Sequence, residues 1–229
     1  MNDNPVIAVD GPSGSGKGTL AVWLARRLKW HLLDSGALYR IVAWSALAQD
    51  VSLDAAAALA RLAVQLKIRF EIGNAGVIVW ANGVDVSDAI RAEEVSIAAS
   101  RVAALAPVRA ALLEAQHGFC TRPGLVADGR DMGTVVFPSA HLKIFLDASA
   151  EERAERRYKQ LKDKDLGVSL RALLANIRER DERDRSRAVS PLKPAADAVV
   201  IDSSDLSIET VCARVWQHVI ERGLIPGDR

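Results

Sequence analysis

The chain has 229 residues, of which 49% are hydrophobic and 26% are charged, and its formal net charge is +1. This length accommodates one sizeable α/β domain with an insertion, or two small domains. A nearly neutral chain has no overall electrostatic field that attracts nucleic acid or an anionic membrane, so neither is expected as a partner. Cys120 and Cys212 form no spacing motif, and the chain shows neither a signal-peptide pattern nor an apolar run of membrane-spanning length. We expect a cytoplasmic protein.

The strongest local motif is Gly11-Pro12-Ser13-Gly14-Ser15-Gly16-Lys17-Gly18-Thr19, which lies between the apolar run 6–9 and the helix-prone run 20–25. In this strand–loop–helix context, G-x-x-x-x-G-K is typical of a phosphate-binding loop. Backbone N–H groups and the helix N-terminus would face the phosphates, and Lys17 would add a full charge. Gly18 stands where the motif usually has Ser or Thr, so direct Mg²⁺ ligation by the hydroxyl of Thr19 stays open. The alternative is a flexible glycine turn beside an ordinary surface lysine.

The next elements are predicted in chain order. They are a strand at 31–33, a turn at 34–36 that caps a helix through Trp44, a helix at 54–66, a small antiparallel β unit from 67 to 84, and a mostly helical stretch from about 87 to 119 that is interrupted near Pro107. Strands follow at 125–127, 142–146 and 198–201, with two charged helices between 149 and 187 and a closing helix that Gly223 ends.

Five short apolar strands separated by helices predict a doubly wound, mostly parallel sheet with helices on both faces. Ligands of such sheets bind at the carboxyl ends of the strands. Four polar clusters fall there: the glycine loop, Asp34-Ser35, 128–131 and Asp147. Asp128 could hold Mg²⁺ through water as a Walker-B type carboxylate, or it could simply form a turn before Gly129.

The arginine-rich stretch from Arg153 to Arg187 allows two interpretations of its function. Mixed charges at helical spacing usually form a solvated, salt-bridged face. Two subsets favour anion binding instead. Arg180, Asp184 and Arg187 share one helical face, and Arg153, Arg156 and Arg157 follow a strand end, where they could close over phosphates. Arg40 and Arg130 are candidates for a second anion clamp.

Four motifs resemble the bacterial cytidylate kinases, members of the P-loop nucleoside monophosphate kinases. They are the segments 34–40, 128–134, 143–148 and 180–185, in addition to the glycine loop. The resemblance spans nearly the whole chain. It implies phosphoryl transfer from ATP, with Mg²⁺, to CMP or dCMP. It also implies a core of residues 1–66 and 120–229, a nucleoside monophosphate-binding insertion at 67–119, and a mobile lid at 150–168.

The resemblance also implies roles for individual residues. The glycine loop with Arg156 and Arg157 would bind ATP, and Lys17, Arg130 and Arg187 would be catalytic. The acceptor phosphate would be held by Ser35, Arg40, Arg130 and Arg187. The ribose would be held by Arg180 and Asp184, and the cytosine edge would be recognised by Ser100, Arg109 and Asp131.

Two other functions compete with this one. A nucleotide switch of the GTPase kind would require an Asn-Lys-x-Asp motif, which the sequence lacks. A P-loop kinase for another small acceptor, UMP or a non-nucleotide, would leave residues 67–119 as an unrelated insertion. We expect small nucleotides as partners and a monomeric protein.

Overall fold

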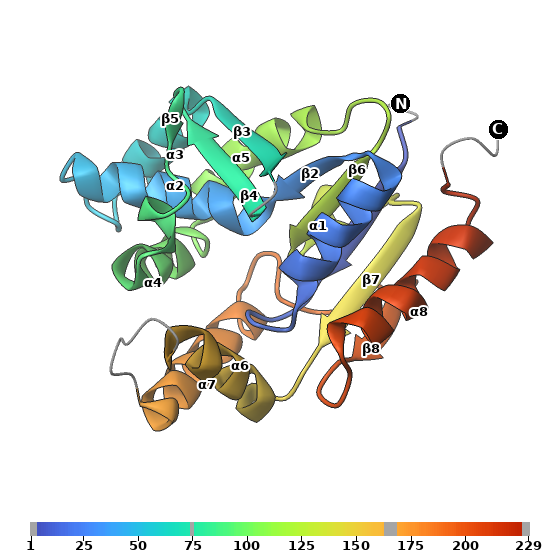
Figure 1. Cartoon of the computed structure of the whole chain (residues 1–229). Coiled ribbons are helices and arrows are strands. Elements are labelled where there is room, and N and C mark those ends of the chain that lie inside the picture. The colour runs from blue at the N-terminus through green and yellow to red at the C-terminus, as the bar shows by residue number, and fades with distance from the viewer. Residues whose placement is uncertain (1–3, 74–75, 163–168, 226–229) are drawn as a thin grey trace.

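The computed structural model describes residues 4–73, 76–162 and 169–225 (Figure 1). Its centre is a five-stranded sheet in the order β2-β6-β1-β7-β8, in which every neighbouring pair is parallel. The strands are β1 (Val6–Asp10), β2 (His31–Asp34), β6 (Leu125–Gly129), β7 (Leu142–Asp147) and β8 (Val199–Asp202). The predicted fold class is confirmed.

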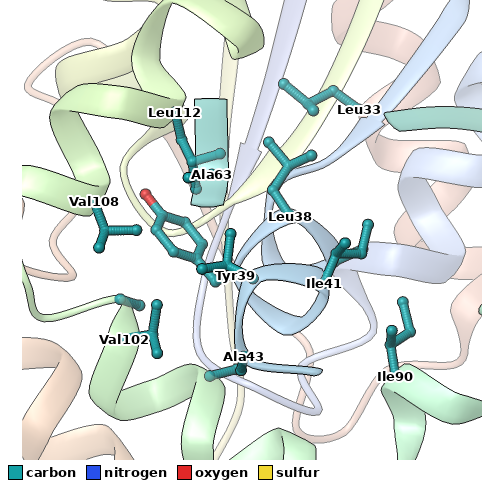
Figure 2. Packing of buried hydrophobic residues seen from close by; sticks show 14 of the residues in the cluster. Leu33, Leu38, Tyr39, Ile41, Ala43, Ala63, Ile90, Val102, Val108 and Leu112 are labelled. Atoms are coloured by element: carbon teal, nitrogen blue, oxygen red, sulfur yellow. The ribbon is translucent and has the colours of Figure 1, made fainter. Parts of the chain in front are cut away.

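Strand alternation divides the core into two layers. Successive side chains point to opposite faces of a sheet, so Ile7 and Val9 pack on one face and Val6 and Ala8 on the other. The first face is covered by α1 (Lys17–Leu28) and α8 (Ile208–Glu221), and the second by α2 (Ser35–Ala48) together with helices of the insertion. Figure 2 shows the second layer, where side chains of α2 lie among Leu33, Ala63, Ile90, Val102, Val108 and Leu112.

The insertion contains a separate antiparallel sheet, as predicted. Its strands are β3 (Ile68–Gly73), β4 (Gly76–Ala81) and β5 (Val84–Asp85), in that order. Its helical part consists of η1 (Ala89–Arg91), α4 (Glu93–Val102) and α5 (Ala106–Gly118) after the sheet. Helix α3 (Ala56–Gln65) lies directly before the insertion. The helical stretch is interrupted between α4 and α5, as predicted, and Pro107 lies in the first turn of α5, where its missing N–H leaves no hydrogen bond unmade.

Two helices follow β7 and approach the carboxyl ends of the strands. They are α6 (Ala150–Lys162) and α7 (Leu170–Arg185), and the predicted lid tip between them, 163–168, lies outside the described residues. The closing helix α8 ends as predicted, because Gly223 takes a left-handed conformation with φ 61°. Within the described ranges no single helix is long and apolar enough to cross a membrane; the pair α4 and α5 meets that test only together, across a 99° bend.

Candidate active site

The glycine loop between β1 and α1 has a backbone path that only glycine tolerates. A Cβ added at Gly11, where φ is 153°, would lie 2.1 Å from the backbone oxygen of Leu146. Gly16 takes a left-handed conformation, with φ 94°, immediately before α1 begins at Lys17. The loop therefore turns tightly over the ends of β1 and β7 and leads into a helix N-terminus, which is the geometry of an anion-binding loop.

Lys17 and Asp128 form a buried ion pair below this loop. The Nζ of Lys17 lies 3.8 Å from Oδ1 of Asp128 and donates a hydrogen bond of 3.4 Å to the carbonyl of Pro12. Burial is the largest influence on both groups: it lowers the pKa of Lys17 to about 8 and raises that of Asp128 to about 6. Two poorly solvated charges of opposite sign thus lie together where the glycine loop meets α1.

The surroundings of Asp128 fit a divalent cation. Its Oδ1 is buried and forms no hydrogen bond with any described residue. A Cβ at Gly18 would lie 3.3 Å from its other oxygen, so glycine leaves the carboxylate accessible. A cavity of about 770 Å³ is bordered here by Gly18, Thr19, Asp34 and Asp128. No group of three His, Cys, Asp or Glu residues in the described ranges could hold a metal alone, so a cation would need oxygen ligands from phosphate or water as well.

A second charged cluster surrounds Asp184 on α7. This carboxylate, 1% exposed, pairs with Arg187 and with Nε of Arg130 at 3.2 Å. Arg180 also belongs to the cluster: burial, followed by the charge of Arg130, lowers its pKa to about 10. The Nε atoms of Arg180 and Arg187 are buried without a hydrogen bond to any described residue. Three guanidinium groups around one carboxylate leave an excess of positive charge that an anion could offset.

Two further predicted acceptor residues reach the same region from α2. Burial lowers the pKa of Arg40, and the charges of Arg130 and Arg157 act in the same direction. One amino group of Arg40 donates to the carbonyl of Ile90 at 3.1 Å. Ser35 packs against Gly129, the last residue of β6, because a Cβ added at Gly129 would lie 2.6 Å from the hydroxyl oxygen of Ser35. Arg130 follows directly. The structure therefore brings all the predicted phosphate ligands of the acceptor to one region.

The residues predicted to recognise the base are only partly together. Asp131 and Arg109 form an ion pair in which both side chains are buried, and the Arg109 guanidinium lies 5.5 Å from the ring centre of Tyr39. Ser100, from α4, instead accepts a hydrogen bond of 2.9 Å from Arg183. Arg109 and Asp131 thus orient each other, whereas Ser100 is held by a different partner.

The predicted lid arginines are not gathered at the glycine loop. Arg156 donates to Glu152 at 2.9 Å and to the carbonyl of Ser203 at 2.6 Å. Arg157 lies 4.0 Å from Glu93 on α4. Their contact with ATP stays a prediction. Arg153 is the arginine of α6 that reaches the loop, but it donates to the backbone of Ser13 and is buried, so it is not open to a phosphate.

Asp10 is a site residue that sequence reasoning missed. It ends β1, and its two carboxylate oxygens accept hydrogen bonds of 2.8 Å from the backbone N–H groups of Met132 and Gly133, in the short π-helical turn η2 (Met132–Val136). Burial raises its pKa to about 7. Asp10 therefore fixes the turn that follows Asp131. The signal that could have located Asp10 is a carboxylate at the end of an apolar strand, and the same pattern predicts the role of Asp128.

The glycine loop offers a site for one chain of phosphates, and the arginine cluster around Asp184 offers a site for a second anion. A P-loop kinase needs two such sites to bring donor and acceptor together. Comparison with known proteins narrows this class. The model of the cytidylate kinase family matches residues 7–221, and the chain belongs to this family.

Individual relatives agree with that assignment. The chain is 60% identical over 214 residues to a cytidylate kinase of Aeromonas hydrophila, covering 93% of both chains. It is 57% identical over 221 residues to a cytidylate kinase of Pseudomonas aeruginosa, covering 96% of both. An uncharacterized protein from Eubacterium ventriosum of solved structure matches with a TM-score of 0.52 at 9% identity, over 95% of this chain and 99% of that one. This last similarity concerns the fold alone.

Proposed function

We propose that the protein transfers the γ-phosphoryl group of ATP to CMP or dCMP, giving ADP and CDP or dCDP. The observation that carries this proposal is the arginine cluster around Asp184, which lies beside the glycine loop and next to the buried Arg109–Asp131 pair. In a member of the cytidylate kinase family, this arrangement offers a place for each part of a cytidine monophosphate.

On the donor side, the backbone of the glycine loop and Lys17 bind the phosphates of ATP. Asp128 would hold Mg²⁺ through water, and the bound ion would neutralise charge on the phosphates of ATP. The low solvation of Lys17 strengthens its attraction to the transferring group, because fewer water dipoles compete with the phosphate.

On the acceptor side, Ser35, Arg40, Arg130 and Arg187 bind the phosphate of CMP, while Arg180 and Asp184 bind the ribose hydroxyls. An oxygen of the acceptor phosphate attacks the γ-phosphorus in line with the bond to the β–γ bridging oxygen. That bond breaks as the new one forms, and ADP leaves with the bonding electrons. The reaction needs positioning and charge neutralisation rather than a covalent intermediate.

At the base, the carboxylate of Asp131 accepts from the exocyclic amino group of cytosine, and Arg109 donates to the ring N3. Uracil presents the opposite polarity at both positions, so its binding leaves buried polar groups unpaired. Ser100 joins Asp131 and Arg109 in contacting cytosine once its hydrogen bond with Arg183 is broken.

The larger organisation follows from these roles. Residues 1–66 and 120–229 form the kinase core, 67–119 the insertion that encloses the acceptor, and 150–168 a lid over the donor phosphates. A monomeric state and a cytoplasmic location stay predictions.

An acceptor panel in a coupled ADP-release assay tests the proposal. We expect CMP and dCMP to support fast turnover, UMP to be much slower, and cytidine and non-nucleotide acceptors to stay near the rate without acceptor. Equal rates for CMP and a non-nucleotide acceptor would refute the proposed substrate and favour the alternative P-loop kinase.

A further inference from the structure

A single buried arginine joins the glycine loop to the helix that carries the acceptor cluster. Arg153 on α6 is 2% exposed. Its Nε donates to the carbonyl of Ala148 at 2.9 Å, and its Nη1 to the carbonyl of Ser13 at 3.1 Å. Both terminal nitrogens also donate to Asp181, Nη1 at 3.0 Å and Nη2 at a short distance, in a bidentate pair. Every nitrogen of this guanidinium therefore has an acceptor within the protein.

The partners of Arg153 lie in both halves of the site. Ser13 is part of the glycine loop, and an added Cβ at Gly14 would lie 3.4 Å from Cβ of Arg153, so the loop also packs on its stem. Asp181 lies on α7, directly after Arg180 and one turn before Asp184. In Figure 1 the loop before α1 approaches α6 and α7, in agreement with these contacts.

We infer that Arg153 and Asp181 are positioning residues that couple the acceptor site to the donor loop. The inference rests on the proposed function, because it takes the cluster around Asp184 to be the acceptor site. Neither residue contacts substrate in this account, because the guanidinium of Arg153 and the carboxylate of Asp181 are already bound to each other and Arg153 is also bound to the protein backbone.

The coupling would begin with electrostatic attraction at the acceptor site and would reach the glycine loop through hydrogen bonds. Without an acceptor, the guanidinium groups of Arg130, Arg180 and Arg187 repel one another around Asp184. A phosphate dianion would replace that repulsion by attraction and would draw α7 towards β6. Because helices move as rigid units, Asp181 would move with α7.

The displacement would pass to the loop through hydrogen bonds of fixed geometry. A bidentate arginine–carboxylate pair resists sliding, so Arg153 follows Asp181 rather than losing it. Its Nη1 is bonded to Asp181 and Ser13 at the same time, and the loop backbone would adjust with it. Binding of CMP would thereby favour one conformation of the phosphate loop, and by reciprocity binding of ATP would favour one position of α7.

The test measures this coupling directly in the full-length protein. The dissociation constant of a non-hydrolysable ATP analogue with Mg²⁺ is determined by calorimetry with and without saturating CMP. For the wild type we expect CMP to tighten binding between about 5- and 150-fold, the usual range of such coupling. In Asp181→Asn and in Arg153→Lys we expect the ratio to fall to within about twofold of unity.

Arg178→Ala is the matched control. Arg178 pairs with Glu151 and so also joins α7 to α6, but both side chains are largely exposed and neither touches the glycine loop. We expect this variant to keep the wild-type ratio. Loss of coupling in all three variants would show that any contact between α6 and α7 matters and would overturn the role of Arg153.

A second measurement needs no variant and therefore does not depend on whether the substitutions fold. In the wild type, CMP alone should change amide hydrogen exchange in the glycine loop as well as in α7. Unchanged exchange in the loop, or a wild-type ratio of one, would overturn the coupling. Turnover of CMP by the wild type is measured first, and its absence would refute the proposed function instead.

Discussion

Replacing Asp131 by Asn separates recognition of the base from every other role of this residue. The residue is 3% exposed and its carboxylate is paired with Arg109, so the change removes one buried negative charge and adds one N–H donor. An amide can donate to the 4-carbonyl of uracil as well as accept from the amino group of cytosine. The variant should therefore lose discrimination between CMP and UMP rather than lose activity with both alike.

The magnitude follows from the unpaired groups. A buried polar group without a partner costs about 1–3 kcal/mol. Relief of one such mismatch for UMP should lower the CMP/UMP ratio of kcat/KM by tenfold or more, since each ~1.4 kcal/mol is a factor of ten. Arg109 loses its ionised partner as well and keeps the carbonyl of Ala103 at 3.2 Å, so the free energy of unfolding should also fall by a few kcal/mol.

The assay is coupled ADP release with CMP and with UMP, on protein whose circular dichroism matches the wild type. Asp184→Asn is the matched control, because that carboxylate is equally buried and ion-paired but is placed on the ribose. The control should lose kcat/KM for both acceptors without changing their ratio. An equal loss for CMP and UMP in Asp131→Asn would refute base recognition and assign Asp131 to the orientation of Arg109.

Three further predictions concern the remaining parts of the site. Lys17→Met should lower kcat on the order of 10²-fold or more with near-native circular dichroism, and a near-native kcat would refute the phosphate-loop role. Arg130→Ala should impair turnover of CMP severely, and cytidine should be a very poor acceptor for the wild type; cytidine as good as CMP would exclude the second anion clamp. Burial raises the pKa of Asp10 from 3.8 to about 7, so between these pH values the native state holds a proton that the unfolded state releases. The contribution of Asp10 to the free energy of unfolding is therefore present below about pH 4 and falls by up to about 4 kcal/mol as the pH rises to 7. Denaturant titrations between pH 4 and 7 should therefore give a flatter profile for Asp10→Asn than for the wild type, and parallel profiles would contradict this.

Local signals explain what the sequence could predict. The five core strands are short apolar runs, and the glycine loop has its strand and helix on either side, so each could be located from neighbouring residues alone. Asp34 and Asp128 follow such runs, and the register pairs them directly across β2 and β6. Their proximity could be expected because parallel strands end at one edge of the sheet, although the strand order itself depends on packing between distant segments.

Side-chain partners inside the charged helices could not be predicted in the same way. Arg153 and Arg156 lie three residues apart on α6, and the sequence predicts both near phosphates. The rise of the helix separates them by about 4.5 Å, so one reaches the glycine loop and Asp181 while the other reaches Ser203. Which arginine is buried depends on how α6 packs against α7, and no spacing within either helix specifies that.

The fate of the γ-phosphoryl group tests the central claim most directly. Wild-type protein is incubated with Mg²⁺, ATP labelled in the γ-phosphoryl group, and CMP, and the products are separated and counted. We predict that the label appears in the β-phosphoryl group of CDP and that its appearance requires CMP. Label released only as inorganic phosphate, at a rate that does not depend on CMP, would contradict the account and favour a nucleotide-hydrolysing switch.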